Sequence, residues 1–164
     1  MEVLRQYVVQ CDQLGPVSCF LQGNPTATAV FLTVHDVGSS YLDWVEFARN
    51  ALPELAGRAL FLHVCLPGQE PGAADLPAGL RFPTMAELGL QLVTVLDHLR
   101  VDRVVGLGDG AGANIITRFA MNHPSRVHGV MTINNTATTS LGRFMERLQV
   151  KNTNTQKEKS LNKK

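Results

Sequence analysis

The middle of the chain alternates short apolar runs with segments whose apolar residues recur at helical spacing. The apolar runs predict strands at Ala29–Val34, 60–64, 101–107 and 127–133. Consecutive strands separated by helices must run parallel, because a parallel pair needs a crossover connection. The alternation therefore predicts an α/β fold, a mostly parallel sheet with helices on both faces, whose ligands bind beyond the carboxyl ends of the strands.

The helix near residue 84 has the strongest boundary signals. Thr84-Met85-Ala86-Glu87 fits a capping box, in which the threonine and glutamate side chains each bond the other residue's backbone. Further helices are predicted over 41–52 and 110–122, and a short one over 140–150. Before Ala29, two more strands are predicted at 3–11 and 18–22, separated by a turn around Gly15-Pro16.

Composition divides the chain into one domain and a tail. Residues 1–150 carry arginine as their only strong base, and every lysine lies beyond them, at Lys151, Lys157, Lys159, Lys163 and Lys164. Residues 151–164 contain one large apolar residue, Leu161, so we expect a disordered basic tail after a domain of residues 1–150. The net charge of +1 gives no reason to expect nucleic-acid binding.

Three cysteines, Cys11, Cys19 and Cys65, lack the spacing of a metal site and are odd in number. Buried thiols in a reducing compartment are therefore expected, with no metal and no cofactor. No apolar run reaches the length of about 18 residues that a membrane span needs, and no signal peptide is recognisable. The expected location is the cytoplasm.

The glycine-rich stretch 106–113 (GLGDGAGA) lies where a strand meets a helix. A dinucleotide-binding turn with alanine in its last position is one interpretation, although such a turn normally opens its domain. A Walker loop is excluded because no Gly-Lys-Ser/Thr is present. The third interpretation is a nucleophile elbow, which requires small residues two positions before and two after the nucleophile.

The register of this elbow follows from a resemblance downstream. Residues 119–127 (FAMNHPSRV) resemble the stretch by which α/β-hydrolases leave the elbow helix and enter the next strand. In that family the nucleophile precedes this proline by fourteen positions, which is Gly110 here. The elbow then keeps Gly108 and Gly112 and has lost the nucleophile. Asp109 would have Leu107 and Ala111 as its flanking residues, so we expect it to cap the helix rather than attack a substrate.

A second resemblance concerns the oxyanion hole. His35-Asp36-Val37-Gly38 is similar to a hydrolase stretch that usually reads His-Gly. Asp36 would place a carboxylate where negative charge needs stabilisation, and His35 is expected to order the turn by hydrogen bonding. The acid and base of a triad follow the nucleophile in chain order, and residues beyond 110 offer no candidates. No catalytic residue is therefore predicted.

Four linked motifs narrow the resemblance to the N-myc downstream-regulated (NDRG) family: residues 35–38, 63–69 (HVCLPGQ), 82–88 (FPTMAEL) and 106–113. This resemblance implies an α/β-hydrolase fold of which only the N-terminal part is present. It also implies a non-catalytic cytoplasmic protein of signalling, growth, differentiation or stress response, acting through unidentified protein partners. Cys65 departs from the family's aspartate. The expected vestigial pocket comprises His35, Asp36, Gly38, Cys65, Gly108, Asp109, Gly110 and Ala111.

Two alternative functions remain open at this point. One is a hydrolase-like enzyme that uses an unrecognised residue, and the other is a binder of small molecules in the vestigial pocket. The resemblance also suggests a truncated isoform that ends after about the sixth strand. In the full fold that strand is internal, so strand 127–133 is expected to expose an apolar edge that favours self-association.

Overall fold

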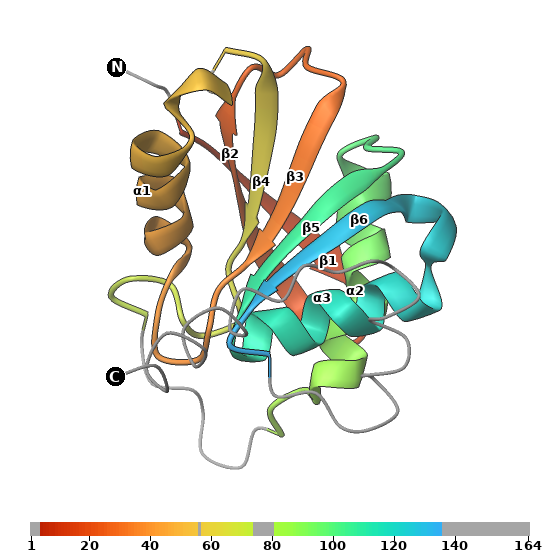
Figure 1. Cartoon of the computed structure of the whole chain (residues 1–164). Coiled ribbons are helices and arrows are strands. Elements are labelled where there is room, and N and C mark those ends of the chain that lie inside the picture. Colours follow the sequence, from red (N-terminus) through yellow and green to blue (C-terminus); the bar gives the residue numbers. More distant parts are fainter. Residues whose placement is uncertain (1–3, 56, 74–80, 136–164) are drawn as a thin grey trace, which may run out of the picture.

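The computed structural model describes residues 4–55, 57–73 and 81–135, and Figure 1 shows their arrangement. Six strands form one sheet: β1 (Arg5–Cys11), β2 (Gly15–Gly23), β3 (Ala29–Val34), β4 (Ala59–Val64), β5 (Val104–Asp109) and β6 (Val127–Ile133). Three helices pack on it: α1 (Tyr41–Ala51), α2 (Met85–His98) and α3 (Ala111–Asn122). The helix predicted over 140–150 lies outside the described residues.

The strand order is β1-β2-β4-β3-β5-β6. β3 is parallel to β4 and to β5, and β5 is parallel to β6, whereas β1 and β2 join through antiparallel pairs. The prediction of a mostly parallel sheet is thus confirmed. The strand order reverses at β3, which has β4 on one side and β5 on the other, so the carboxyl ends of β3 and β5 lie next to each other at the switch point, where ligands bind in such sheets.

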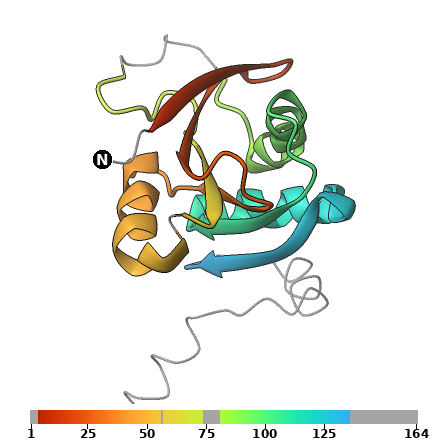
Figure 2. The same cartoon turned by 90° about the horizontal axis from the view of Figure 1, so that it is seen from above.

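Helices cover both faces of the sheet, as predicted (Figure 2). Side chains alternate along each strand, so Leu32 and Leu62 pack in the large core beneath α2 and α3. Phe31 and Phe61 point to the opposite face, where they pack with Ala48 of α1. This burial on both faces explains the continuous apolar runs from which β3 and β4 were predicted.

Most predicted boundaries lie close to the observed ones, and two differences are informative. Thr84 forms both bonds of the capping box with Glu87 at the start of α2, as predicted. The β1–β2 turn lies before Gly15, which already pairs with Cys11 in the sheet. β5 begins at Val104 instead of Val101, because the carbonyls of Val101 and Asp102 accept hydrogen bonds from Arg126.

Candidate functional site

The elbow is formed where β5 passes into α3, beside the end of β3. Val34 and Gly108 are register partners in the parallel β3–β5 pair, so both strands end at the same level. The two residues that follow Val34 therefore lie beside Gly110, which comes two residues after Gly108. The sheet in this way brings together Asp36 and the elbow, although 75 positions separate Asp36 from Ala111 in sequence.

Gly110 has the strained backbone of an elbow, with φ 51° and ψ −115°. Residues with a β-carbon rarely adopt this conformation. A β-carbon built on Gly110 would overlap the carboxylate of Asp36. The volume that a nucleophile side chain would enter is therefore already filled by Asp36.

The two flanking glycines allow α3 to start close to the sheet. A β-carbon on Gly112 would overlap the backbone carbonyls of Val34 and His35. A β-carbon on Gly108 would lie 2.6 Å from the backbone nitrogen of Ala113. The small-residue pattern of the elbow is thus a packing requirement of this strand–helix junction, and it remains without a nucleophile at its centre.

Asp36 also occupies the position of the oxyanion. In α/β-hydrolases the oxyanion hole consists of the N–H of the residue after the nucleophile and an N–H from the loop after β3. The corresponding groups here are the N–H groups of Ala111 and Val37. Both donate to Oδ1 of Asp36, at 2.7 and 2.8 Å respectively. The carboxylate therefore accepts the two bonds that a reaction oxyanion would need.

Both ring nitrogens of His35 form hydrogen bonds with backbone groups. Its Nε2 accepts from the N–H of Leu66 at 3.0 Å, so its Nδ1 carries the proton and donates to the carbonyl of Asp36 at 2.7 Å. The side chain is almost completely buried, and burial lowers its pKa despite the opposing hydrogen bond to Asp36. His35 is a neutral histidine that orders the turn, as expected from the sequence.

The prediction that Asp109 caps α3 is wrong. Gly110 is the N-cap residue and provides no side chain, and Asp36 supplies the acceptor for the first helical N–H instead. Asp109 accepts a hydrogen bond from the side chain of Asn134, just beyond β6, at 3.0 Å. The N–H of Gly110 donates to the carbonyl of Ile133 at 3.0 Å. The end of β6 therefore holds the elbow from the side opposite to Asp36.

A cavity of about 200 Å³ opens beside the elbow, between the carboxyl ends of β3, β5 and β6 and helix α1. Its walls combine three carboxylate side chains with two aromatic rings: Asp36, Asp43, Asp109, Trp44 and Phe47, together with His35, Ser39 and Ile133. A second cavity, of about 440 Å³, reaches Ala111 from the other side and is lined almost entirely by apolar groups of α2, α3 and the preceding loops.

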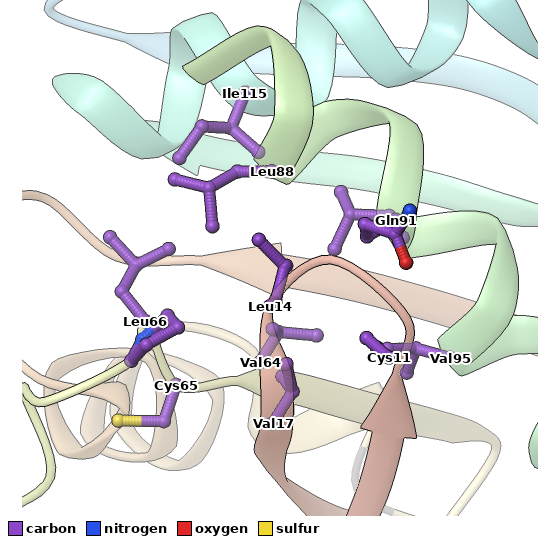
Figure 3. A pocket seen from close by; sticks show the side chains of 12 residues that line it. Cys11, Leu14, Val17, Val64, Cys65, Leu66, Leu88, Gln91, Val95 and Ile115 are labelled. Atoms are coloured by element: carbon purple, nitrogen blue, oxygen red, sulfur yellow. The ribbon is translucent and has the colours of Figure 1, made fainter. Parts of the chain in front are cut away.

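Gly38 and Cys65, which the sequence also placed in the pocket, do not line the cavity beside Asp36. Gly38 donates its N–H to Oε1 of Gln69 at 3.0 Å, which ties the loop after β3 to the loop after β4. Cys65 lines a small apolar cavity beneath α2 (Figure 3). That cavity measures about 10 Å³, which leaves room for one water molecule at most.

The thiols are buried, as expected. Cys11, Cys19 and Cys65 are all buried and unpaired. Burial raises the pKa of Cys65 to about 12, and the charge of Glu70 adds to the effect. A thiol that stays protonated at neutral pH is neither a nucleophile nor a metal ligand.

A buried polar chain was missed by the sequence reasoning. His63 of β4 lies between Thr33 of β3 and Gln22 of β2, with ring nitrogens 2.8 Å from each. Gln22 in turn donates to the carbonyl of Val45 in α1, at 3.3 Å. Burial lowers the pKa of His63 to about 3, so its ring is neutral. The available signal was the pair of polar residues within two otherwise apolar runs.

Strand order, elbow geometry and the oxyanion-hole amides together define an α/β-hydrolase-like fold. A solved structure of the same class, a predicted CIB-like hydrolase from Thermoplasma acidophilum, superposes with a TM-score of 0.72 over 93% of this chain and 72% of that chain. At 15% sequence identity this likeness shows the fold alone. The sequence model of the Ndr family matches residues 7–162, and the chain belongs to that family.

Two relatives show how much of the family's length is present. An uncharacterized protein of Caenorhabditis elegans is 39% identical over 141 residues, which cover 84% of this chain and 43% of the relative. Protein NDRG1 of Xenopus tropicalis is also 39% identical, over 80% of this chain and 35% of the relative. The chain thus spans less than half the length of these relatives.

Two features are absent from residues 4–55, 57–73 and 81–135. No helix among them has the length and apolarity of a membrane span. The same residues contain no group of three or more histidine, cysteine or acidic side chains arranged to hold a metal ion.

Proposed function

We propose that this chain is a non-catalytic member of its family that acts in the cytoplasm through protein interactions, in signalling, growth, differentiation or stress response. The observation that carries the proposal is the position of Asp36. Its carboxylate fills the nucleophile's volume beside Gly110 and accepts both N–H bonds of the oxyanion hole.

Acyl transfer requires the opposite arrangement. A tetrahedral intermediate is stabilised by donors aimed at the place where its negative charge develops. Here those donors already bind a side-chain carboxylate, and a second negative charge beside it would be repelled. His35, the histidine next to Asp36, is also unavailable as a base because both of its ring nitrogens are bonded to the backbone.

The test compares wild type with Gly110→Ala and Asp36→Ala on a panel of carboxylic esters and with a fluorophosphonate probe. We expect no labelling and no turnover above the Gly110→Ala control. Ester turnover by the wild type that disappears in Asp36→Ala, Asp109→Ala or His35→Ala would overturn the proposal and support the hydrolase alternative.

The sheet edge at β6 supports an interaction role. Among the described strands β6 pairs with β5 alone, and Met131 on it is 45% exposed. An unpaired strand edge with apolar side chains is a template for another strand. We propose that β6 mediates self-association or binding of a partner strand. Concentration-dependent light scattering that is abolished by Met131→Lys would support this, and a monodisperse monomer with a cooperative melt at high temperature would contradict it.

The C-terminal residues 151–164 are a separate part of the proposal. Residues 151–164, whose lysine-rich composition differs from that of residues 1–150, are proposed to be encoded by an alternative or shifted reading frame. Amplifying and sequencing the transcript tests this idea, because a spliced or shifted reading frame is expected near the codon of Lys151. A continuous frame leading into a full-length message without a splice would refute it.

The two cavities beside the elbow favour a second candidate function, the binding of a small molecule. The apolar cavity of about 440 Å³ lies in the size range of ligand pockets. A ligand that raises the melting temperature of the wild type, and that loses this effect when Leu88→Trp fills the cavity, would support this candidate. A screen in which every shift persists in Leu88→Trp would contradict it.

A further inference from the structure

The turn between α2 and β5 holds an arginine in a backbone conformation that favours glycine. Arg100 has φ 56° and follows Leu99, the C-cap of α2. Its N–H donates to the carbonyl of Asp97, and the next N–H, of Val101, donates to Leu96. Helices that end with such bonds usually have glycine at this position. The favourable effect of a cation near a helix C-terminus is smaller than the cost of left-handed backbone for a residue with a β-carbon.

Arg126 makes this turn rigid. Its guanidinium donates to the carbonyls of Val101 and Asp102, at 2.8 and 2.6 Å, and pairs with the carboxylate of Asp97 at 2.7 Å. Three bonds from one side chain therefore clamp the segment on both sides of Arg100. The backbone that carries Arg100 and Arg103 is set before any ligand arrives, which reduces the entropy lost on binding.

A cavity of about 300 Å³ lies beside this turn. The turn lies at the amino ends of the parallel strands, at the opposite end of the sheet from the elbow (Figure 1). The basic lining residues of the cavity are Arg100, Arg103 and His128, and Asp102 is its one acidic residue. Among the described residues, Arg100 has no side-chain hydrogen bond or ion pair. Arg103 reaches Asp102 at 3.9 Å, and both side chains are exposed, so that pair is weak.

We propose that this cavity is a binding site for a phosphate-bearing anion, recognised by the guanidinium groups of Arg100 and Arg103 with His128 beside them. Guanidinium groups bind phosphate through paired N–H donors, and two of them line this cavity without strong partners of their own. The strained backbone at Arg100 is then the cost of placing one guanidinium at the cavity, where a glycine would give a more stable turn.

The proposal predicts that one substitution weakens ligand binding without lowering the stability of the fold. Arg100→Gly removes a ligand group and also relieves the left-handed strain, so binding should weaken while the urea midpoint stays equal or rises. Arg103→Ala should weaken binding without relieving strain. Arg49→Ala removes the same charge from the exposed surface of α1, at a residue that does not line the cavity, and serves as the matched control.

The experiment titrates the full chain with inorganic phosphate and with pyrophosphate at constant ionic strength, followed by amide NMR and by thermal unfolding. We expect shifts confined to residues 100–103 and 128 and, at ten times the dissociation constant, a rise of about 3–6 °C in melting temperature. Arg100→Gly should lower the affinity about tenfold or more, in line with the loss of one charge-assisted contact, and Arg49→Ala should not.

Three results would overturn the inference. The first is the absence of saturable binding of phosphate or pyrophosphate. The second is equal weakening of binding in Arg100→Gly and Arg49→Ala, which indicates non-specific charge effects.

A parallel assay uses vesicles of phosphatidylcholine with and without phosphatidic acid. Arg100-dependent vesicle binding together with pyrophosphate binding assigns the phosphate to a lipid headgroup, and pyrophosphate binding alone assigns it to a soluble ligand. Vesicle binding without pyrophosphate binding is the third overturning result, because a flat basic surface would then explain it.

Discussion

The contact between Asp36 and Gly110 predicts a large energetic coupling. Gly110→Ala places a methyl group inside the volume of the Asp36 carboxylate, so that carboxylate must leave the N–H groups of Val37 and Ala111. Losing these two charge-assisted bonds should cost about 2–4 kcal/mol. The left-handed backbone at residue 110 adds about 1–2 kcal/mol for any residue with a β-carbon.

Asp36→Ala should lose the same two bonds, and therefore about 2–4 kcal/mol on its own. In the double variant Asp36→Ala/Gly110→Ala the bonds are lost once, and the methyl group enters space that the carboxylate has vacated. The double variant should thus be more stable than the sum of the single effects, by about 2–4 kcal/mol, the value of the bonds that the sum counts twice.

Urea unfolding of the four proteins measures this coupling, with linear extrapolation to water. Asp43→Ala combined with Gly110→Ala is the control cycle, because Asp43 lines the same cavity but the three atoms nearest to a β-carbon at residue 110 all belong to Asp36. That cycle should be additive to within about 0.5 kcal/mol. Additivity in the Asp36 cycle as well would refute the claim that Asp36 fills the nucleophile's position.

Three further predictions concern other parts of the fold. Gly112→Ala should unfold at lower urea concentration than wild type, since its methyl group would overlap the carbonyl of Val34; an unchanged midpoint in urea would contradict the close approach of α3 to β3. His63 has a folded-state pKa of about 3, below its unfolded value, so stability should fall as pH drops from about 6.5 toward 3, and His63→Gln should flatten that slope. A slope unchanged by His63→Gln would assign it to other groups. Cys65 should resist iodoacetamide at pH 8 in the native state and react in urea, as peptide mass mapping would show; rapid native alkylation would contradict its burial.

The sheet was predictable from the sequence because β3, β4 and β5 are buried on both faces. Such strands need continuous apolar runs, and the crossover between parallel strands accounts for the helices between them. The start of β5 was not predictable, because it depends on Arg126, which reaches back from beyond α3 to bond Val101 and Asp102. A tertiary contact of this kind leaves no local pattern.

The elbow, like the sheet, was predictable from the sequence only in part. Its glycines are visible in the sequence, and the resemblance of residues 119–127 and 35–38 to α/β-hydrolases placed Gly110 at the nucleophile position and Asp36 near an oxyanion hole. The capping role expected for Asp109 was wrong, because local propensity favours the nearest aspartate, whereas the parallel register of β3 and β5 presents Asp36 to α3. The chain of Thr33, His63 and Gln22 depends on strand order in the same way.

Amide NMR during a pH titration tests most directly whether Asp36 occupies the oxyanion hole of this elbow. An N–H bonded to a carboxylate changes its proton chemical shift when that carboxylate is protonated. The amides of Val37 and Ala111 should therefore titrate together, with the same midpoint as the Asp36 side-chain carbon, and Asp36→Asn should abolish both transitions. Amides that do not respond to the ionisation of Asp36, or that keep their transitions in Asp36→Asn, would contradict the account.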